Sequence, residues 1–169
     1  MKFTFIENIS VAVATIALGI MAGFFWTYTF NVNPAMLNVD GQTYAEVQSL
    51  LNQNVRHEIF FAFFFGAGLL SFLAAVINYK HIKYISFWLI VAAALIYIVG
   101  VIVFTAQVNL PLNYYTESWS AMALPKDWED VRLAWNQANA IRVGTSFIAF
   151  TLCVCVLCLR CSSSSSEIT

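Results

Sequence analysis

The sequence is poor in charged residues, which make up only 10% of its 169 positions. Soluble domains carry about 25%, whereas here hydrophobic residues reach 60% and the mean hydropathy is +0.74. It contains only three prolines and two histidines, so helix breakers are rare and a metal site would need carboxylate ligands as well. A composition this apolar predicts a membrane protein.

Other absences narrow the class further. No basic cluster is present and the net charge is −1, so nucleic acid is not an expected partner. The apolar runs do not alternate in polarity, which excludes a transmembrane β-barrel built of roughly 10-residue strands. The first run lacks a small-x-small cleavage site and exceeds the usual signal-peptide core of about 7–15 residues, so we expect it to be a retained helix.

Four runs reach the roughly 20 apolar residues that a helix needs to cross a hydrocarbon core of about 30 Å. These runs predict an all-α, multi-pass integral membrane four-helix bundle over residues 1–161, with the lipid bilayer as its main partner. The tail at residues 162–169 is rich in serine and is expected to be disordered. The predicted spans are residues 9–30, 58–78, 85–107 and 140–160.

The positions of lysine and arginine predict the orientation. Lys2, Lys80, Lys83 and Arg160 all flank one end of the spans, and the positive-inside rule places that end in the cytoplasm. Both termini are therefore expected to be cytoplasmic, and the connections 31–57 and 108–139 form two outer loops.

Each outer loop is predicted to contain a short helix. Asp40 can cap a helix that continues to Gln53, where Tyr44, Val47 and Leu51 make one apolar stripe. In the second loop, a helix beginning near Pro125 runs without a breaker into the fourth span. Before it, Asn109, Pro111 and Asn113 suggest a stiff polar turn.

The helix that enters the fourth span carries a stripe at spacings of three and four residues, which places its members on one face. On one interpretation, the stripe anchors the helix at the lipid headgroups. On the other it faces inward, and the buried cation of Arg142 then needs a partner, for which Glu58 is the acid of similar depth. The stripe comprises Trp128, Arg132, Trp135, Asn139 and Arg142.

His57 and Glu58 lie together at the outer end of the second span and raise the possibility of a metal. A dependable site needs three or more protein ligands, and His81 lies about 36 Å away along the same helix, at 1.5 Å per residue. No metal site is therefore predicted.

The cysteines gather at the inner end of the fourth span. One membrane helix spreads Cys153, Cys155, Cys158 and Cys161 around its surface, so they do not converge on one ion. Their position favours lipid-facing residues or S-palmitoylation of Cys158 and Cys161.

The first two spans are rich in phenylalanine, and we expect these side chains to pack within the bundle and against lipid. Gly23, Gly66 and Gly68 could let helices approach or leave room beside the rings. A flat apolar ligand could be held there.

Several motifs resemble those of the DUF1772 family of four-helix membrane proteins, which includes the fungal anthrone oxygenase-like proteins. These are the glycine-containing first span ending in Asn33–Pro34, TAQVNLPLN at Thr105–Asn113, and WNQANAIR at Trp135–Arg142. The resemblance implies a four-helix membrane fold and, more weakly, oxygenation of an anthrone-like aromatic molecule. The implied oxygenation requires no metal or flavin cofactor, because dioxygen adds to an electron-rich carbanion.

In such a reaction His57 would be the base, and Arg142, Asn109 and Asn113 would stabilise the enolate-like oxygen. Pro111, Trp135, Asn139 and Glu58 would complete the surroundings of the ligand.

A different class of function is also open: a non-enzymatic scaffold or accessory subunit that binds a membrane protein partner, or a second copy of itself, through its outer loops. Tyr114, Tyr115 and Trp119 would then be interface anchors. A transporter is less consistent with the sequence, because Pro34, Pro111 and Pro125 all lie outside the spans and no inverted repeat is visible.

Overall fold

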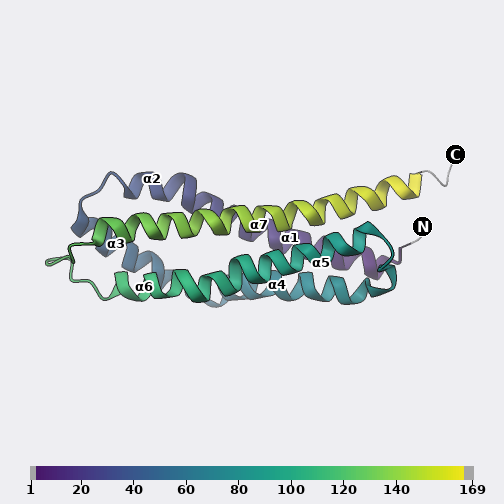
Figure 1. The fold of residues 1–169 in the computed structure, drawn as a ribbon, viewed down its shortest axis with the longest axis horizontal. Helices are drawn as coiled ribbons and strands as arrows, with labels where there is room; N and C mark the ends of the chain where they lie inside the picture. The colour runs from purple at the N-terminus through teal and green to yellow at the C-terminus, as the bar shows by residue number, and fades with distance from the viewer. Residues whose placement is uncertain (1–2, 166–169) are drawn as a thin grey trace.

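A computed structural model describes residues 3–165, with side chains to residue 162, and these residues fold as an elongated helical bundle (Figure 1). Four long helical rods run lengthwise, and α1 begins at the same end at which α7 finishes. The first rod comprises α1 (Phe5–Thr27), the π-helical η1 (Tyr28–Val32) and α2 (Asn33–Met36). The second is α4 (Glu58–Ile77), the third joins α5 (Ile85–Tyr97), π-helical η3 (Ile98–Val103) and η4 (Thr105–Asn109), and α6 (Leu110–Glu117), and the fourth is α7 (Trp128–Ser165). The remaining elements are α3 (Gly41–Asn54) and a short 3-10 turn, η2 (Tyr79–His81).

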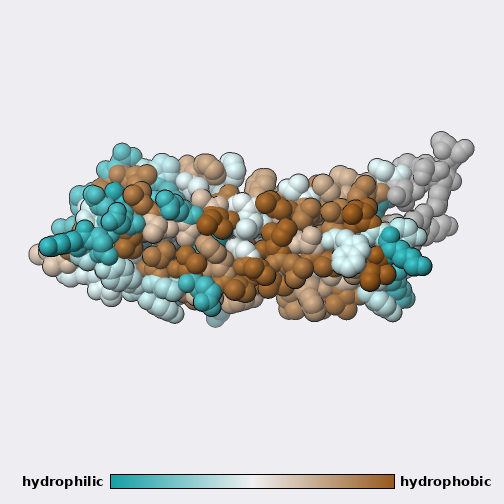
Figure 2. Space-filling view, viewed as in Figure 1, coloured by the Kyte–Doolittle hydropathy of each residue, from teal (hydrophilic) through white to brown (hydrophobic). Residues whose placement is uncertain are grey.

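The all-α membrane fold predicted from the sequence is confirmed. The four rods are long and apolar enough to cross a membrane, and Figure 2 shows a hydrophobic band between two more polar ends. Three rods extend beyond the predicted spans, to Phe5–Met36, Ile85–Glu117 and Trp128–Ser165. The helix α7 alone, with 38 residues, is about 57 Å long at 1.5 Å per residue and exceeds the roughly 30 Å hydrocarbon core. One part of the bundle therefore stands outside the hydrocarbon. Residues 166–169 of the predicted serine tail lie outside the described residues.

The predicted stiff turn at Asn109, Pro111 and Asn113 is wrong, because the chain there is helical. Asn109 ends η4, and Pro111 and Asn113 lie in α6. Proline is tolerated because it occupies the start of α6, where its missing amide hydrogen and fixed φ do little harm. Pro34 occupies the same place in α2.

The helix α3 completes the bundle at the end away from the start of α1, which is the outer end in the orientation predicted from the sequence. Asp40 caps it as predicted, with Oδ1 accepting from the Thr43 amide at 2.9 Å. It packs against α6, and the two helices lie at the end of the molecule away from the N-terminus of α1. The fourth position of the bundle is thus taken by α4 in one half and by α3 in the other.

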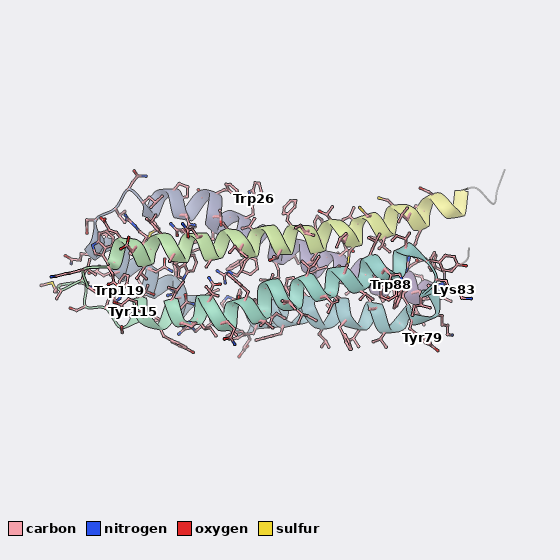
Figure 3. All side chains as sticks on the ribbon, viewed as in Figure 1. Trp26, Tyr79, Lys83, Trp88, Tyr115 and Trp119 are labelled. Atoms are coloured by element: carbon pink, nitrogen blue, oxygen red, sulfur yellow. The ribbon has the colours of Figure 1, made fainter. Side chains whose placement is uncertain are left out.

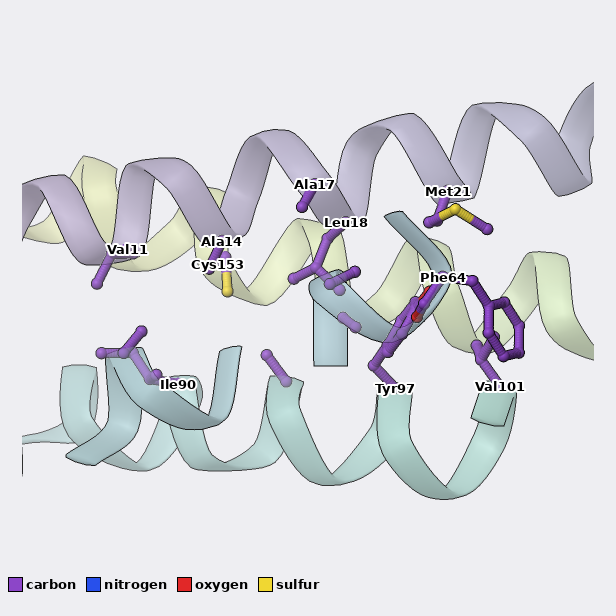
Figure 4. Packing of buried hydrophobic residues seen from close by; sticks show 14 of the residues in the cluster. Val11, Ala14, Ala17, Leu18, Met21, Phe64, Ile90, Tyr97, Val101 and Cys153 are labelled. Carbon is purple, nitrogen blue, oxygen red and sulfur yellow. The ribbon is translucent and has the colours of Figure 1, made fainter. Parts of the chain in front are cut away.

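The hydrophobic core runs along the centre of the membrane-spanning half (Figure 4). Small residues such as Ala14, Ala17 and Cys153 allow α1 and α7 to lie close together, while larger side chains such as Leu18 and Ile90 fill the space between rods. Such small residues favour close helix packing in membranes.

Glycines of α4 and the third rod allow close approaches between helices. A Cβ at Gly100 would meet Thr145 Cγ2 at 2.6 Å, and one at Gly68 would meet Ile102 Cδ1 at 2.8 Å. Gly23 and Gly66, in contrast, have no atom within 4 Å of such a Cβ. Of the two roles expected for these glycines, Gly68 allows a close helix approach, whereas Gly23 and Gly66 border open space.

The inner end is closed by a buried arginine. Arg160 donates to Asn78 Oδ1 at 2.8 Å and to the Glu7 carbonyl and Asn8 Oδ1, both at 3.1 Å. His81 Nε2 lies 3.2 Å from Glu7 Oε1. These contacts join α1, the α4–α5 connection and the end of α7.

Candidate functional site

The guanidinium of Arg142 lies inside the bundle, at the outer part of the membrane-spanning half. It is 7% exposed. Its Nη2 donates to Asn139 Oδ1 at 2.6 Å, and its Cζ lies 4.7 Å from the Phe25 ring centroid and 5.5 Å from that of Trp135. This confirms the inward interpretation of the α7 stripe for its three inner members.

Among the described residues, no carboxylate forms an ion pair with Arg142, so the expected pairing with Glu58 is wrong. Glu58 is exposed at the first turn of α4, where a negative charge is favoured by the helix dipole. Arg142 Nε has no hydrogen-bond partner. A buried cation without a counter-charge is costly, and it favours an anionic or strongly accepting ligand.

Asn139 fixes the position of Arg142. Because its Oδ1 accepts from the guanidinium, its Nδ2 faces α1 and donates to the Phe25 carbonyl at 3.2 Å and to Thr29 Oγ1 at 2.7 Å. These bonds tie α7 to the point where α1 passes into η1.

One turn further out, Trp135 joins α7 to α6. Its indole Nε1 donates to Asn113 Oδ1 at 2.6 Å. The ring also packs on Tyr28, with centroids 4.6 Å apart. The indole of Trp135 therefore contacts both Tyr28 and Arg142.

The third rod contributes an unusual stretch of backbone beside this cluster. Two π-helical segments, η3 and η4, follow one another there, and π-turns often occur at functional sites. Thr145 Oγ1 donates to the Gly100 carbonyl at 3.1 Å, while Asn113 bonds Trp135. Between these two contacts the antiparallel rods place Asn109 near the level of Asn139 and Arg142.

Asn109 is fully buried, and neither its Nδ2 nor its Oδ1 has a hydrogen-bond partner. The Oγ1 of Thr105, one turn along, is also buried and unpaired. Buried polar atoms are paired in most structures, so these atoms are available to a ligand or to water.

A chain of polar side chains leads from this cluster to the outer helices. Tyr28 donates its hydroxyl to Gln48 Oε1 at 2.6 Å, Gln48 Nε2 donates to Asn52 Oδ1 at 2.9 Å, and Asn52 Nδ2 donates to Thr116 Oγ1 at 3.2 Å. Gln48, Asn52 and Thr116 are all buried. The chain connects η1, α3 and α6.

His57 lies at the rim and not in the buried cluster. It is exposed and caps α4, with Nδ1 accepting from the Phe60 amide at 3.3 Å. The rings of Phe60 and Phe24 lie 5.3 Å apart, and Phe24 precedes Phe25, whose ring Arg142 contacts. Because His57 comes three residues before Phe60, it lies about one helical turn outside the level of Arg142. Together with Arg56, Glu58 and Phe61 it lines an open depression of about 450 Å³.

The aromatic side chains of the outer loop are partly engaged within the protein. Trp119 packs against Tyr115 at 5.6 Å and Tyr44 at 6.3 Å, and Tyr115 donates its hydroxyl to Asp127 at 3.0 Å. Tyr115 and Trp119 lie at the opposite end of the molecule from Tyr79, Lys83 and Trp88 (Figure 3). Tyr114 is 62% exposed, and Arg56 lies over its ring.

Tyr44 and Asp40 are among the groups of the outer region whose pKa is shifted. Burial raises the pKa of the Tyr44 hydroxyl well above its usual range, so this side chain stays neutral. Hydrogen bonds from Thr43 hold the pKa of the Asp40 carboxyl below its usual value. Neither of these two groups forms a hydrogen bond with the described residues of the cluster around Arg142.

Across residues 3–165, no group of three or more histidine, cysteine or acidic side chains is placed to hold a metal ion. His81 lies at the inner end with Glu7, as its distance along the helix predicted. Cys153 is buried, whereas Cys155, Cys158 and Cys161 are exposed on α7.

The sequence interpretation missed Tyr28, Tyr97, Gln48, Asn52 and Thr116. The spacing of Gln48 and Asn52 on one face of α3, four residues after Tyr44, was the available signal. Tyr28 and Tyr97 have no comparable pattern in the sequence.

Comparison with known proteins gives one match. The sequence model of the anthrone oxygenase family matches residues 54–152, a range that contains α4, all of the third rod and the first two-thirds of α7. Among curated proteins and solved structures nothing matches. Because the matched range covers more than half of the chain and includes the motifs around Asn109 and Arg142, this membrane protein belongs to the anthrone oxygenase family.

Proposed function

We propose that the chain binds a flat, apolar aromatic molecule of the anthrone type at the outer side of the bundle and promotes its oxygenation. The observation that carries this proposal is the buried Arg142 guanidinium, which has no carboxylate partner among the described residues. An enolate-like oxygen would supply the missing negative charge. The rings of Phe25 and Trp135 flank the guanidinium and suit a planar hydrocarbon ligand.

The reaction balances without a further reactant. A base removes a proton from the central methylene of the anthrone, and the carbanion forms a C–O bond with dioxygen to give a peroxide anion. That anion takes a proton, and the hydroperoxide then loses its remaining C–H proton while the O–O bond breaks and water leaves. The products are a quinone and water, with dioxygen as the oxidant.

Arg142 stabilises the developing enolate oxygen, because a fixed donor in a dry site favours the charge that forms on it. Asn109 supplies a second, unpaired amide, and Asn113, held by Trp135, borders the same space. The pairing of Asn139 with Arg142 orients the guanidinium.

His57 is the proposed base. Because the same side chain caps α4, the cap limits when His57 can accept a proton. Its Nδ1 accepts from the Phe60 amide, so the proton of the neutral ring lies on Nε2. To accept a proton, Nδ1 has to release the amide of Phe60. The bond is long, at 3.3 Å, and the depression beside His57 and Glu58 opens to the surface.

Oxygen uptake tests the proposal. The purified protein in lipid nanodiscs should consume dioxygen when anthrone is added, and Arg142→Met and His57→Asn should each abolish the uptake. Asparagine keeps the cap of α4, and Lys83→Met, at the exposed inner end, is the control for loss of a cation. Uptake retained in both variants would overturn the proposal. Uptake lost only in Arg142→Met would support the binding site at Arg142 and exclude His57 as the base.

The accessory function is the second candidate, because Tyr114 and Met122 are 62% and 87% exposed at the outer end. A membrane protein partner or a second copy could use them as anchors. Purification in mild detergent decides this: a monodisperse single chain with no co-purifying subunit would contradict it.

A further inference from the structure

The polar chain from Tyr28 to α6 has only one possible direction. Its last member, Thr116, donates to the Asn113 carbonyl at 3.0 Å, and a carbonyl can only accept. Thr116 Oγ1 therefore accepts from the amide of Asn52, whose own oxygen must accept from Gln48. Gln48 Oε1 is left to accept, so the hydroxyl of Tyr28 has to donate to it.

This direction determines what Tyr28 presents to the buried cluster. Its proton is committed to Gln48 at 2.6 Å, and only the lone pairs of its oxygen remain. Tyr28 and Arg142 lie against the same indole, with 4.6 Å between the rings of Tyr28 and Trp135 and 5.5 Å from the guanidinium to Trp135. The site thus contains a fixed acceptor beside a fixed donor.

Tyr97 shows the same arrangement on the third rod. Its hydroxyl donates to the Phe64 carbonyl at 3.1 Å, so its oxygen also has only lone pairs left to offer. Tyr97 is fully buried in the core, whereas Tyr28 is only partly buried and lies at the outer side. Of the two oxygens, that of Tyr28 is the one nearer to the rim.

We propose that Tyr28 is a specificity-determining residue that recognises a hydroxyl group on the aromatic ligand, at a ring position that does not adjoin the oxygen that Arg142 binds. This inference rests on the proposed function. The ligand hydroxyl donates to the Tyr28 oxygen, and the carbonyl or enolate oxygen accepts from the guanidinium. Gln48 and Asn52 are positioning residues that hold the tyrosine proton away from the ligand.

The chemistry gives the expected size of the effect. A site built to bind a hydroxyl discriminates against the analogue without it, because a buried polar group is then left unpaired. One such bond corresponds to a preference of about tenfold to a hundredfold. The preference should depend on α3, although α3 itself does not reach the ligand.

Binding of stable quinones tests the inference without turnover. The probes are anthraquinone and 2-hydroxyanthraquinone, whose hydroxyl is too far from the carbonyl for an internal hydrogen bond, and the signal is quenching of tryptophan fluorescence in nanodiscs. The wild-type protein should bind the hydroxylated probe at least about tenfold more tightly. Tyr28→Phe should abolish that preference, so that both probes bind with similar affinity.

Variants of Gln48 separate positioning from general damage. Gln48→Leu removes the acceptor, lets the Tyr28 hydroxyl rotate and should reduce the preference, whereas Gln48→Glu keeps an acceptor and should retain it. Equal preference in the wild type and in Tyr28→Phe would overturn the inference and leave the proposed function standing. Absence of binding by either probe would contradict the proposed function itself, and this inference with it.

Discussion

The indole of Trp135 donates to Asn113 Oδ1 at 2.6 Å and so joins α7 to the end of the third rod. The bond lies between the buried cluster around Arg142 and the outer helices. It is the only side-chain hydrogen bond between α6 and the described part of α7, so it carries much of the connection between these rods in the outer half.

Trp135→Phe keeps a flat ring but leaves the Asn113 oxygen without its donor. The free energy of unfolding should fall by about 1–3 kcal/mol, the usual cost of an unsatisfied buried acceptor. Denaturant titration in mixed micelles measures it. Trp26→Phe is the control, since Trp26 is 47% exposed; an equal loss in both variants would show that the bond contributes nothing specific.

Gly100→Ala should destabilise the bundle, because the new Cβ would lie 2.6 Å from Thr145 Cγ2 and 2.8 Å from its Cβ. Overpacking of this kind costs about 1–3 kcal/mol. Gly23→Ala, where no atom lies within 4 Å, should unfold at the wild-type midpoint or slightly above it. The reverse order of stabilities would mean that the third and fourth rods are not this close.

The cap of α3 should respond to acid. The folded pKa of Asp40 lies below its unfolded value, so its contribution to stability is fully present above the unfolded pKa of about 3.9 and is lost as pH falls through the folded pKa. The protection of the Thr43 amide against exchange, relative to its intrinsic exchange rate at each pH, should therefore fall at low pH. Asp40→Asn keeps a capping oxygen without that titration, and an identical acid response in this variant would assign the effect elsewhere.

The predicted orientation can be checked with single cysteines. Met122→Cys at the outer tip, where Met122 is 87% exposed, should react with a membrane-impermeant maleimide in intact cells. Tyr79→Cys, at the opposite end of the molecule, should react only after permeabilisation. Labelling of the wild type gives the background, and the opposite pattern would place both termini outside.

Acylation of Cys158 and Cys161 remains a prediction from their position at the inner boundary. Both side chains are exposed, whereas Cys153 is buried. Hydroxylamine-dependent capture from a eukaryotic membrane should recover the wild-type chain and fail for the Cys158→Ser/Cys161→Ser double variant. Cys153→Ser should be captured as efficiently as the wild type.

The membrane spans could be predicted from the sequence because apolar length is a local property. The ends of the helices could not, since a helix can continue outside lipid wherever another element covers it, as α3 and α6 show. Pro111 indicated a turn, yet a proline at the start of α6 extends the rod without breaking it.

Half of the site could also be predicted. Arg142, Asn139 and Trp135 share a face of one helix, so their spacing was sufficient. Gln48 and Asn52 are polar residues on a helix outside the predicted spans, where exposure was the natural expectation. Only their contacts with Tyr28 and Thr116, from distant parts of the chain, bury them.

The helix α7 is fastened at both ends of its membrane-spanning length. Arg160 is held by α1 and the α4–α5 connection, and Asn139 is held by α1 about 32 Å away, at 1.5 Å per residue. Turning this helix about its axis would break both sets of bonds at once, so α7 is held against rotation. Any adjustment to an incoming molecule then falls to α3, which is anchored near the site by side-chain contacts alone.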